Sequence, residues 1–439
     1  MIKRITLSIA YILLTSGMIY AQKEVSLREC LELGLQQNYD IQIVRGEEKI
    51  SDNNATMAAA GLLPTLDLSA GVNGKITDTH TTTTDDVKTS SYGVFDQSAN
   101  AGVNLNWTIF EGMKLRTSYK RLQELKSMGH IKSRITIEDF IASIVAEYYN
   151  LVQQTLRLEN YDYAVKLSRE RLRITEERFK IGSFSRLDLL QARVDFNADS
   201  SRYMSQQETV MASRIRINEL IALQDINERI TARDTSIQVN KDLIWEKLHE
   251  GTLKTNAQLL MAENQTRVSE LDLRSVRSRN YPYLRLTAGY GYNYNRYGSG
   301  STRQRSTLSP DFGLKLGFNI FDGNRRREQT NARIEVDNAR LTVEKTRQGL
   351  MADLANFYQA YRNNIELISL EEQNLIAARE NYEIAKERYL LGDLPGIEMR
   401  EAQLSLLDAE ERLLSAKYNT KLCEISLRQI SGDIQLYLE

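Results

Sequence analysis

Proline, cysteine and histidine are scarce in this sequence. Its 439 residues include 4 Pro, 2 Cys and 3 His. Because proline interrupts helices, so few of them permit very long helices. The two cysteines, Cys30 and Cys423, and three widely spaced histidines argue against a zinc framework or a disulfide scaffold. We therefore expect no metal and no cofactor.

The sequence also has no large excess of positive or negative charge. The 57 basic side chains nearly balance 58 acidic ones, so no global field attracts nucleic acid. A hydrophobic content of 41% with 26% charged residues excludes both wholesale disorder and a helical membrane protein with many spans. No Gly-Lys-Ser/Thr phosphate loop and no Ser/His/Asp or Cys/His set is evident, so nothing in the sequence supports an enzyme.

Residues 1–21 have the pattern of a secretory signal peptide. Lys3 and Arg4 precede an apolar stretch over 5–14, and the segment ends in Ala21. The alternative is a membrane anchor, but the apolar stretch is shorter than the roughly 20 residues that a spanning helix needs. We predict cleavage after Ala21.

The rest of the chain consists of an internal sequence duplication. Three landmarks recur in the same order, 218, 211 and 210 residues further on: Leu63–Gly71 as Tyr281–Gly289, Trp107–Gly112 as Phe318–Gly323, and Glu177–Gly182 as Glu387–Gly392. The offset falls by seven after the first landmark. The second copy therefore has a shorter loop between Gly289 and Phe318.

In each copy the apolar pattern changes from helical to alternating after a proline. Runs of about ten residues with one apolar and one polar face predict membrane-spanning strands, as β-hairpins over 65–110 and 283–321. Polar loops are expected over 77–98 and 297–309. Aromatic residues at the strand ends mark the expected membrane interfaces: Trp107, Phe110, Phe318 and Phe321 at one end, Tyr292 and Tyr294 at the other. The alternative is a half-buried soluble hairpin.

Four strands are too few to close a barrel. A single-chain barrel needs about eight, and an open strand edge in lipid leaves backbone groups unpaired. Strands must therefore come from several chains, eight in a dimer or twelve in a trimer.

Long helical patterns follow each hairpin. Residues 112–180 contain no proline and would form a helix of roughly 100 Å, and residues 324–390 match them. Returning helices follow over about 186–223 and 397–430. The shorter helices over 40–62 and 256–280 could stack end to end with them. Such helices predict a tall antiparallel coiled-coil wall.

The duplicated order of helix, hairpin, long helix, turn and helix resembles the TolC-like outer membrane efflux protein family. The resemblance covers about 25–432. It is carried by Ser26–Leu31 with Asn38, Leu63–Leu66, Ile109–Gly112, Phe179–Gly182 and their counterparts in the second copy. It implies a homotrimer in which four strands per chain make a 12-stranded membrane β-barrel on a 12-helix α-barrel. The chain would divide into the signal peptide (1–21), a first repeat (22–223, helical hairpin 112–223), an equatorial linker (224–255), a second repeat (256–432, helical hairpin 324–431) and a tail (433–439).

The resemblance also implies passive export. The channel would lie in the outer membrane of a Gram-negative bacterium with a large periplasmic extension. It would contact outer membrane lipid, a periplasmic adaptor (membrane fusion) protein and an inner-membrane transporter of the RND, ABC or a similar class. Drugs, metal ions and secreted proteins stay open as cargo. The runner-up is a periplasmic coiled-coil adaptor or structural protein without membrane insertion.

The resemblance places a gate just after the second helical turn. Glu398 and Glu401 occupy two acidic positions three residues apart, which lie on one helix face. In a trimer they would form two rings of carboxylates that favour cations. The alternative is a solvated charged face at a helix start.

Contacts that would close this gate are only partly matched. The resemblance assigns this role to Tyr389 and Asp188, but its arginine position is Leu394 here; Arg186 or Arg400 could substitute. Asp188 also fits a capping box that begins at Ser185.

The resemblance predicts adaptor docking at the two turns, through Ile181, Gly182, Ser183, Leu391, Gly392 and Asp393. The resemblance also implies an equatorial collar built from residues 224–255 and the two termini. Cys30 and Cys423 both fall near this collar, where a disulfide is conceivable in an oxidising compartment.

Overall fold

The computed structural model describes residues 23–438, so the expected signal peptide lies outside the described residues. The chain forms two compact units. The helical unit holds residues 23–45, 133–259 and 346–438, and the strand unit holds 46–132 and 260–345. Each unit takes segments from both sequence repeats, because the helices and strands of one repeat pack against those of the other.

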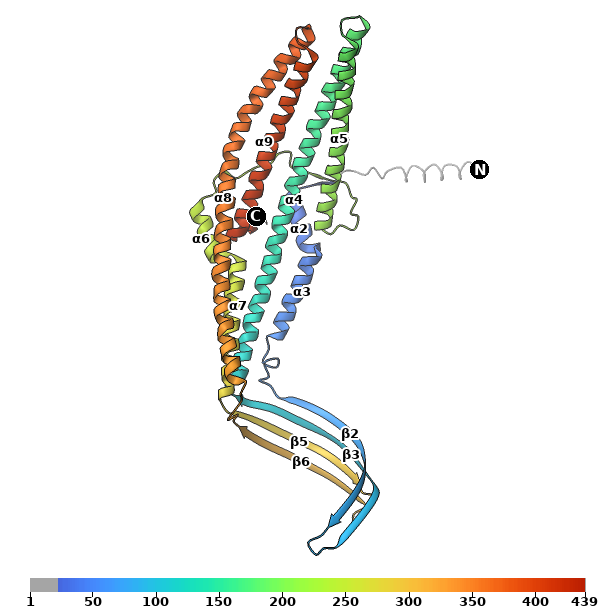
Figure 1. Cartoon of the computed structure of the whole chain (residues 1–439), viewed down its shortest axis with the longest axis vertical. Helices are drawn as coiled ribbons and strands as arrows, with labels where there is room; N and C mark the ends of the chain where they lie inside the picture. The colour runs from blue at the N-terminus through green and yellow to red at the C-terminus, as the bar shows by residue number, and fades with distance from the viewer. Residues whose placement is uncertain (1–22, 439) are drawn as a thin grey trace, which may run out of the picture. The chain divides into compact units, whose positions relative to one another are not determined.

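The elements occur in the same order twice (Figure 1). The first copy comprises α2 (Leu27–Gln37), α3 (Tyr39–Asn54), β2 (Thr65–Thr82), β3 (Lys88–Glu111), α4 (Lys114–Lys180) and α5 (Arg186–Leu220). The second comprises α6 (Trp245–Thr255), α7 (Ala257–Arg277), η1 (Ser278–Asn280), β5 (Tyr283–Arg296), β6 (Gln304–Gly317), α8 (Arg325–Leu391) and α9 (Gly396–Ser431). Short segments at the start, the linker and the end are β1 (Lys23–Val25), β4 (Ile230–Ala232) and η2 (Ile434–Leu438).

The two long helices, α4 and α8, have 67 residues each. At 1.5 Å per residue each is about 100 Å long, and none of the four prolines falls inside them. Helix α4 begins after Gly112 and Met113, whose φ angles of 56° and 72° turn the chain out of β3. A Cβ atom at Gly112 would lie 2.1 Å from the Ser278 carbonyl oxygen, so only glycine fits there.

The short helices follow the returning helices end to end, and one asparagine makes each junction. The Asn38 side chain donates to the Leu220 carbonyl at 3.0 Å and accepts from the Ile41 amide at 3.2 Å. Asn256 donates in the same way to the Ile430 carbonyl at 2.9 Å. The end-to-end stacking expected from the sequence is therefore confirmed within the helical unit.

The four long strands form one antiparallel sheet in the order β2-β3-β5-β6. Pairing of β2 with β3 continues to Thr82 and Lys88. The predicted polar loop over 77–98 is therefore wrong, since most of it is strand and only 83–87 make the turn. Five threonines lie between 77 and 83, and β-branched residues favour strands despite their polarity. In the second hairpin the loop is also shorter than predicted, because β6 begins at Gln304.

The register gives the sheet one apolar and one polar face. Leu68, Val103 and Tyr290 are directly paired neighbours, as are Ala288 and Phe312. The opposite face carries rows such as Asp67, Asn104, Gly289 and Asp311. The apolar side chains stay exposed in the single chain, at 80% for Leu68 and 88% for Phe312.

The helical unit has an apolar core around α4. Ile141, Ile144, Tyr148 and Leu151 are fully buried. Cys30 belongs to this core, whereas Cys423 belongs to a separate cluster with Leu354 and Tyr361. No disulfide joins these two described cysteines.

Within residues 23–438, no helix combines the length and apolar character required to cross a membrane.

Candidate functional site at the helical turns

The two helical hairpins of the helical unit end in turns of the same design. Gly182 and Gly392 have φ angles of 77° and 91°, a left-handed conformation that favours glycine at a helix end. The Ser183 amide donates to the Arg178 carbonyl at 2.9 Å, and the Asp393 amide donates to the Arg388 carbonyl at 3.0 Å. These bonds satisfy carbonyls that the helix leaves unpaired.

All six residues predicted to dock an adaptor are exposed at these turns. Ile181 and Leu391 present large apolar side chains, 79% and 78% exposed. Phe184 and Leu394, by contrast, pack beneath the turns. The turns thus have hydrogen-bonded backbones and apolar tips.

Glu398 and Glu401 lie on the exposed face of α9, just after the second turn. Met399 and Ala402 on the opposite face are buried in an apolar cluster, which fixes the direction of the two carboxylates. Neither carboxylate forms an ion pair with another described residue. The structure therefore places both predicted gate residues on one outward face.

Tyr389 is buried beneath the turns, with 3% of its surface exposed. Its hydroxyl lies 3.1 Å from the Thr175 hydroxyl of α4. The Arg178 guanidinium lies 5.5 Å from the centre of the Tyr389 ring and donates to the Tyr389 and Leu390 carbonyls at 3.2 and 2.8 Å. Arg178 thus ties the first hairpin to the C-terminal end of α8, where its charge complements the helix dipole.

Leu394 stands where the family resemblance places an arginine. It is buried with Tyr382, Tyr389, Met399 and Leu406. An apolar contact therefore occupies this position. Sequence reasoning missed Arg178, although an arginine in the last turn of α4 was a usable signal.

Asp188 caps helix α5. Its carboxylate accepts from the Ser185 hydroxyl at 2.6 Å and from the Ser185 amide at 2.9 Å, and the Ser185 hydroxyl accepts from the Asp188 amide at 3.2 Å. This reciprocal capping box was one of the two roles expected. Hydrogen bonds from the side chain and backbone of Ser185 hold the pKa of Asp188 below its ordinary value. Asp188 and Tyr389 also line one cavity of about 130 Å³.

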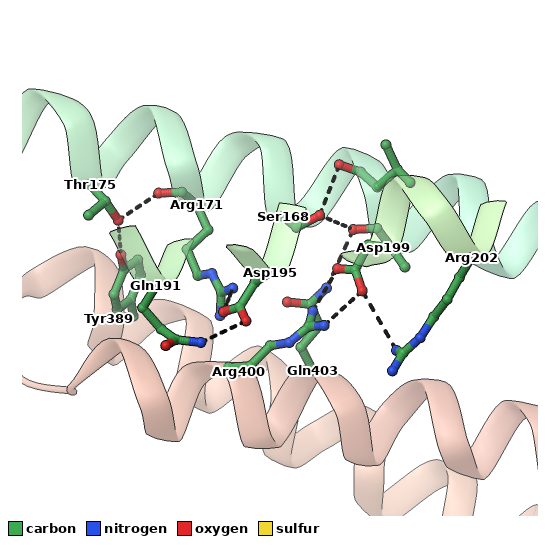
Figure 2. A network of polar contacts seen from close by, with 12 residues as sticks. Ser168, Arg171, Thr175, Gln191, Asp195, Asp199, Arg202, Tyr389, Arg400 and Gln403 are labelled. Atoms are coloured by element: carbon green, nitrogen blue, oxygen red, sulfur yellow. Dashed lines mark hydrogen bonds and ion pairs between the residues drawn. The ribbon is translucent and has the colours of Figure 1, made fainter. Parts of the chain in front are cut away.

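A second polar network lies deeper between the hairpins (Figure 2). Arg400 of α9 donates two hydrogen bonds to the two carboxylate oxygens of Asp199 on α5, both at 2.7 Å. The Asp199 side chain is only 1% exposed. Burial lowers the pKa of Arg400, but the hydrogen bond and charge of Asp199 raise it overall above its ordinary value.

Arg171 and Asp195 add a second buried ion pair in the same network. Gln191 donates to Asp195 at 3.0 Å. Burial lowers the pKa of Arg171 below its ordinary value, against the influence of Asp195. These ion pairs therefore join helices α4, α5 and α9. Removing one partner of such a pair would destabilise the fold, because it would leave an unpaired charge in the interior. Of the two arginines named from the sequence, Arg400 makes such a bridge and Arg186 is exposed; the partner Asp199 was missed because sequence spacing does not show it.

The sheet carries the residues predicted for the membrane interfaces. Trp107 and Phe110 belong to β3, and Tyr292 and Tyr294 belong to β5. Phe318 and Phe321 follow β6, which ends at Gly317, and both are exposed.

Known proteins resemble this chain along most of its length. The profile of the outer membrane efflux protein family matches residues 30–223 and 248–433. Outer membrane protein TolC of Vibrio cholerae is 21% identical over 399 residues, covering 86% of this chain and 84% of the relative. A probable efflux pump outer membrane protein, TtgC of Pseudomonas putida, is 20% identical and covers 79% and 71%.

The CmeC outer membrane channel of Campylobacter jejuni has the same fold. Its TM-score is 0.79 at 19% identity, covering 93% of this chain and 85% of that structure. The expected fold, α-helical hairpins with four strands per chain, is confirmed, as is the expected outer membrane location. With both repeats matched by one family profile, the chain belongs to the outer membrane efflux protein family.

Proposed function

We propose that this chain is one subunit of a trimeric outer membrane channel that exports substrates received from an inner-membrane pump and a periplasmic adaptor. In this proposal the four strands span the outer membrane and the helical hairpins extend into the periplasm. Residues 22–223 and 256–432 act as two equivalent repeats joined by the linker 224–255.

The sheet carries this proposal. Its apolar face is exposed in the single chain, and β2 and β6 each have only one neighbouring strand. In lipid, an open strand edge would leave backbone groups unpaired, at a cost of several kcal/mol each. Three copies, each adding four strands, close a 12-stranded barrel in which every edge is paired and every apolar face meets lipid.

The aromatic residues support the same arrangement. Tyr292 and Tyr294 lie toward one end of the sheet, and Trp107 and Phe110 toward the other. Tyrosine and tryptophan favour the two membrane–water interfaces, because their rings are amphipathic.

The second turn would form the gate. With threefold symmetry, Glu398 and Glu401 give six carboxylates around the axis, which favour cations and disfavour anions. The Arg400–Asp199 bridge holds the α9 helix that carries them against α5. In place of the arginine that the resemblance expects at Leu394, Arg178, Tyr389 and this bridge would keep the gate closed, with Asp188 capping α5 beside them.

The exposed turns at Ile181, Gly182, Ser183, Leu391, Gly392 and Asp393 would dock the adaptor. Exposed apolar side chains at these tips could anchor in an apolar pocket of a partner surface. A pump partner is supported by the name of the relative TtgC, an efflux pump outer membrane protein. The alternative, a periplasmic adaptor without membrane insertion, leaves the exposed apolar face of the sheet unexplained.

Membrane fractionation and gel electrophoresis of the full-length protein test the proposal. We expect the protein in the outer membrane fraction, and a trimer on unheated gels that dissociates on heating. A water-soluble monomer in the periplasmic fraction would contradict it.

A further inference from the structure

The polar face of the sheet holds two cations directly opposite each other. Arg285 on β5 pairs in register with Lys315 on β6, so both side chains project from the same face. Both are exposed. Like charges at directly opposed positions destabilise a sheet unless something else offsets their repulsion.

No carboxylate of the strand unit neutralises this pair within the described residues. The third strand in this row contributes Thr108, which is uncharged. Glu111 lies opposite Tyr283, two residues from Arg285 along β5, and its carboxylate is engaged by Lys114 at 3.3 Å. Asp311 lies four residues from Lys315 along β6, about 13 Å away at the rise of a strand.

The surroundings of the pair are open and orient the arginine. Gly313 and Gly317 flank Lys315 on the same face, so no neighbouring side chain of β6 crowds it. The Tyr283 ring lies across Gly317, where an added Cβ would come within 2.3 Å of it. The Arg285 guanidinium lies 4.8 Å from the centre of that ring. A planar guanidinium stacked on an aromatic ring keeps its donors available for a ligand.

We propose that Arg285 and Lys315 form an oxyanion-binding site on the lumen side of the β-barrel. The inference rests on the proposed channel function, because it assumes that the polar face of the sheet lines the pore. Guanidinium and ammonium groups bind phosphate oxygens through charge-assisted hydrogen bonds. Three copies would place three such pairs around the lumen, as charged rings do in anion-selective pores. The lumen would then favour anions at the level of this pair, whereas the carboxylates at the helical turns favour cations.

The probe is inorganic pyrophosphate, added to the full-length protein in planar bilayers. We expect it to reduce the current through the wild-type channel. Lys315→Gln should weaken this block about tenfold, since one charge-assisted bond is lost, and Lys315→Gln with Arg285→Gln should abolish it. Lys315→Arg should retain it. The matched control is Arg296→Gln, which removes one positive charge from the same hairpin but on the apolar face of the sheet.

Calorimetric titration of pyrophosphate into the detergent-solubilised protein gives a second readout that does not need conduction. Binding that disappears in the double variant supports the site. Equal binding or equal block in the wild type and the double variant, with channels that still conduct, overturns the site and leaves the channel proposal intact. A wild-type protein that inserts as a monomer and neither conducts nor binds pyrophosphate overturns both.

Discussion

Charged residues at the helical turns and on the sheet are arranged in opposite ways. Between the hairpins, the buried Asp199 and the mostly buried Arg400 are paired through two hydrogen bonds of 2.7 Å. On the polar face of the sheet, Arg285 and Lys315 are exposed and stand beside each other with the same sign. Buried paired charges hold one conformation, because losing a partner leaves a costly charge in the interior. Exposed charges of one sign do not hold a conformation in this way and remain free to act on a solute.

The largest effect is expected at the buried bridge. Asp199→Asn leaves the Arg400 guanidinium buried without its anionic partner, which should cost about 3–5 kcal/mol of unfolding free energy. Urea unfolding of the detergent-solubilised protein measures this, and bilayer recordings should show higher conductance as the second turn loosens.

Arg202 provides the control for this bridge. Its guanidinium lies 3.8 Å from Asp199 and is largely exposed, so Arg202→Gln should cost at most about 1 kcal/mol. Equal losses in the two variants would show that burial does not distinguish the two contacts.

The two faces of the sheet should differ in their tolerance of charge. Leu68→Arg places a cation on the apolar face and should destabilise the inserted barrel by about 2–4 kcal/mol near the bilayer centre. Ser69→Arg, one residue further along β2, points to the polar face and should assemble normally. The yield of heat-modifiable trimer measures both, and equal assembly of the two variants would argue against lipid on the apolar face.

The carboxylates at the second turn should control ion preference. Glu398→Ala with Glu401→Ala removes six negative charges from a trimer, so cation selectivity and block by divalent cations should both decrease. The reversal potential in a salt gradient measures selectivity.

Glu383→Ala with Glu387→Ala is the charge-matched control, since both residues are exposed on α8 of the same hairpin. We expect it to leave the reversal potential close to that of the wild type. If this control loses selectivity and the Glu398 and Glu401 variant does not, the gate is not formed by Glu398 and Glu401.

The smallest effect concerns the cap of α5. Ser185→Ala removes the hydroxyl that binds Asp188 and should cost about 1 kcal/mol of unfolding free energy at neutral pH. Because the pKa of Asp188 is lowered in the folded protein, its stabilising effect is present above the ordinary pKa and is lost as pH falls through the lowered value. The unfolding free energies of the wild type and Ser185→Ala should therefore converge as the pH is lowered from 7 to acid. A difference that stays constant with pH would show that Asp188 is not its cause.

Local features of the site were readable from the sequence where the physics is local. The capping box needs only Ser185 and Asp188, three residues apart, and each turn needs a glycine at the end of a long helix. The long helices follow from the absence of proline over 67 residues. The strands of the first hairpin are longer than the sequence predicted. Threonines favour strands because of their β-branched shape, while their polarity suggests a loop.

Long-range pairing was not readable. Asp199 and Arg400 are 201 residues apart, and the sequence around each residue does not indicate which residue it pairs with. The sequence shows Arg285 and Lys315 at polar positions of two strands with alternating apolar and polar residues. Their juxtaposition depends on a register that a shift of one residue would abolish.

The duplicated order of elements, the lengths of the helices and the two faces of the strands can be predicted from the sequence alone. They follow from periodicity and from the placement of proline and glycine, which act over a few residues. Long-range packing selects which charges are neutralised and which are left exposed, because that depends on how helices and strands distant in sequence pack. The buried Arg400–Asp199 bridge and the open Arg285–Lys315 pair are the two outcomes of that packing.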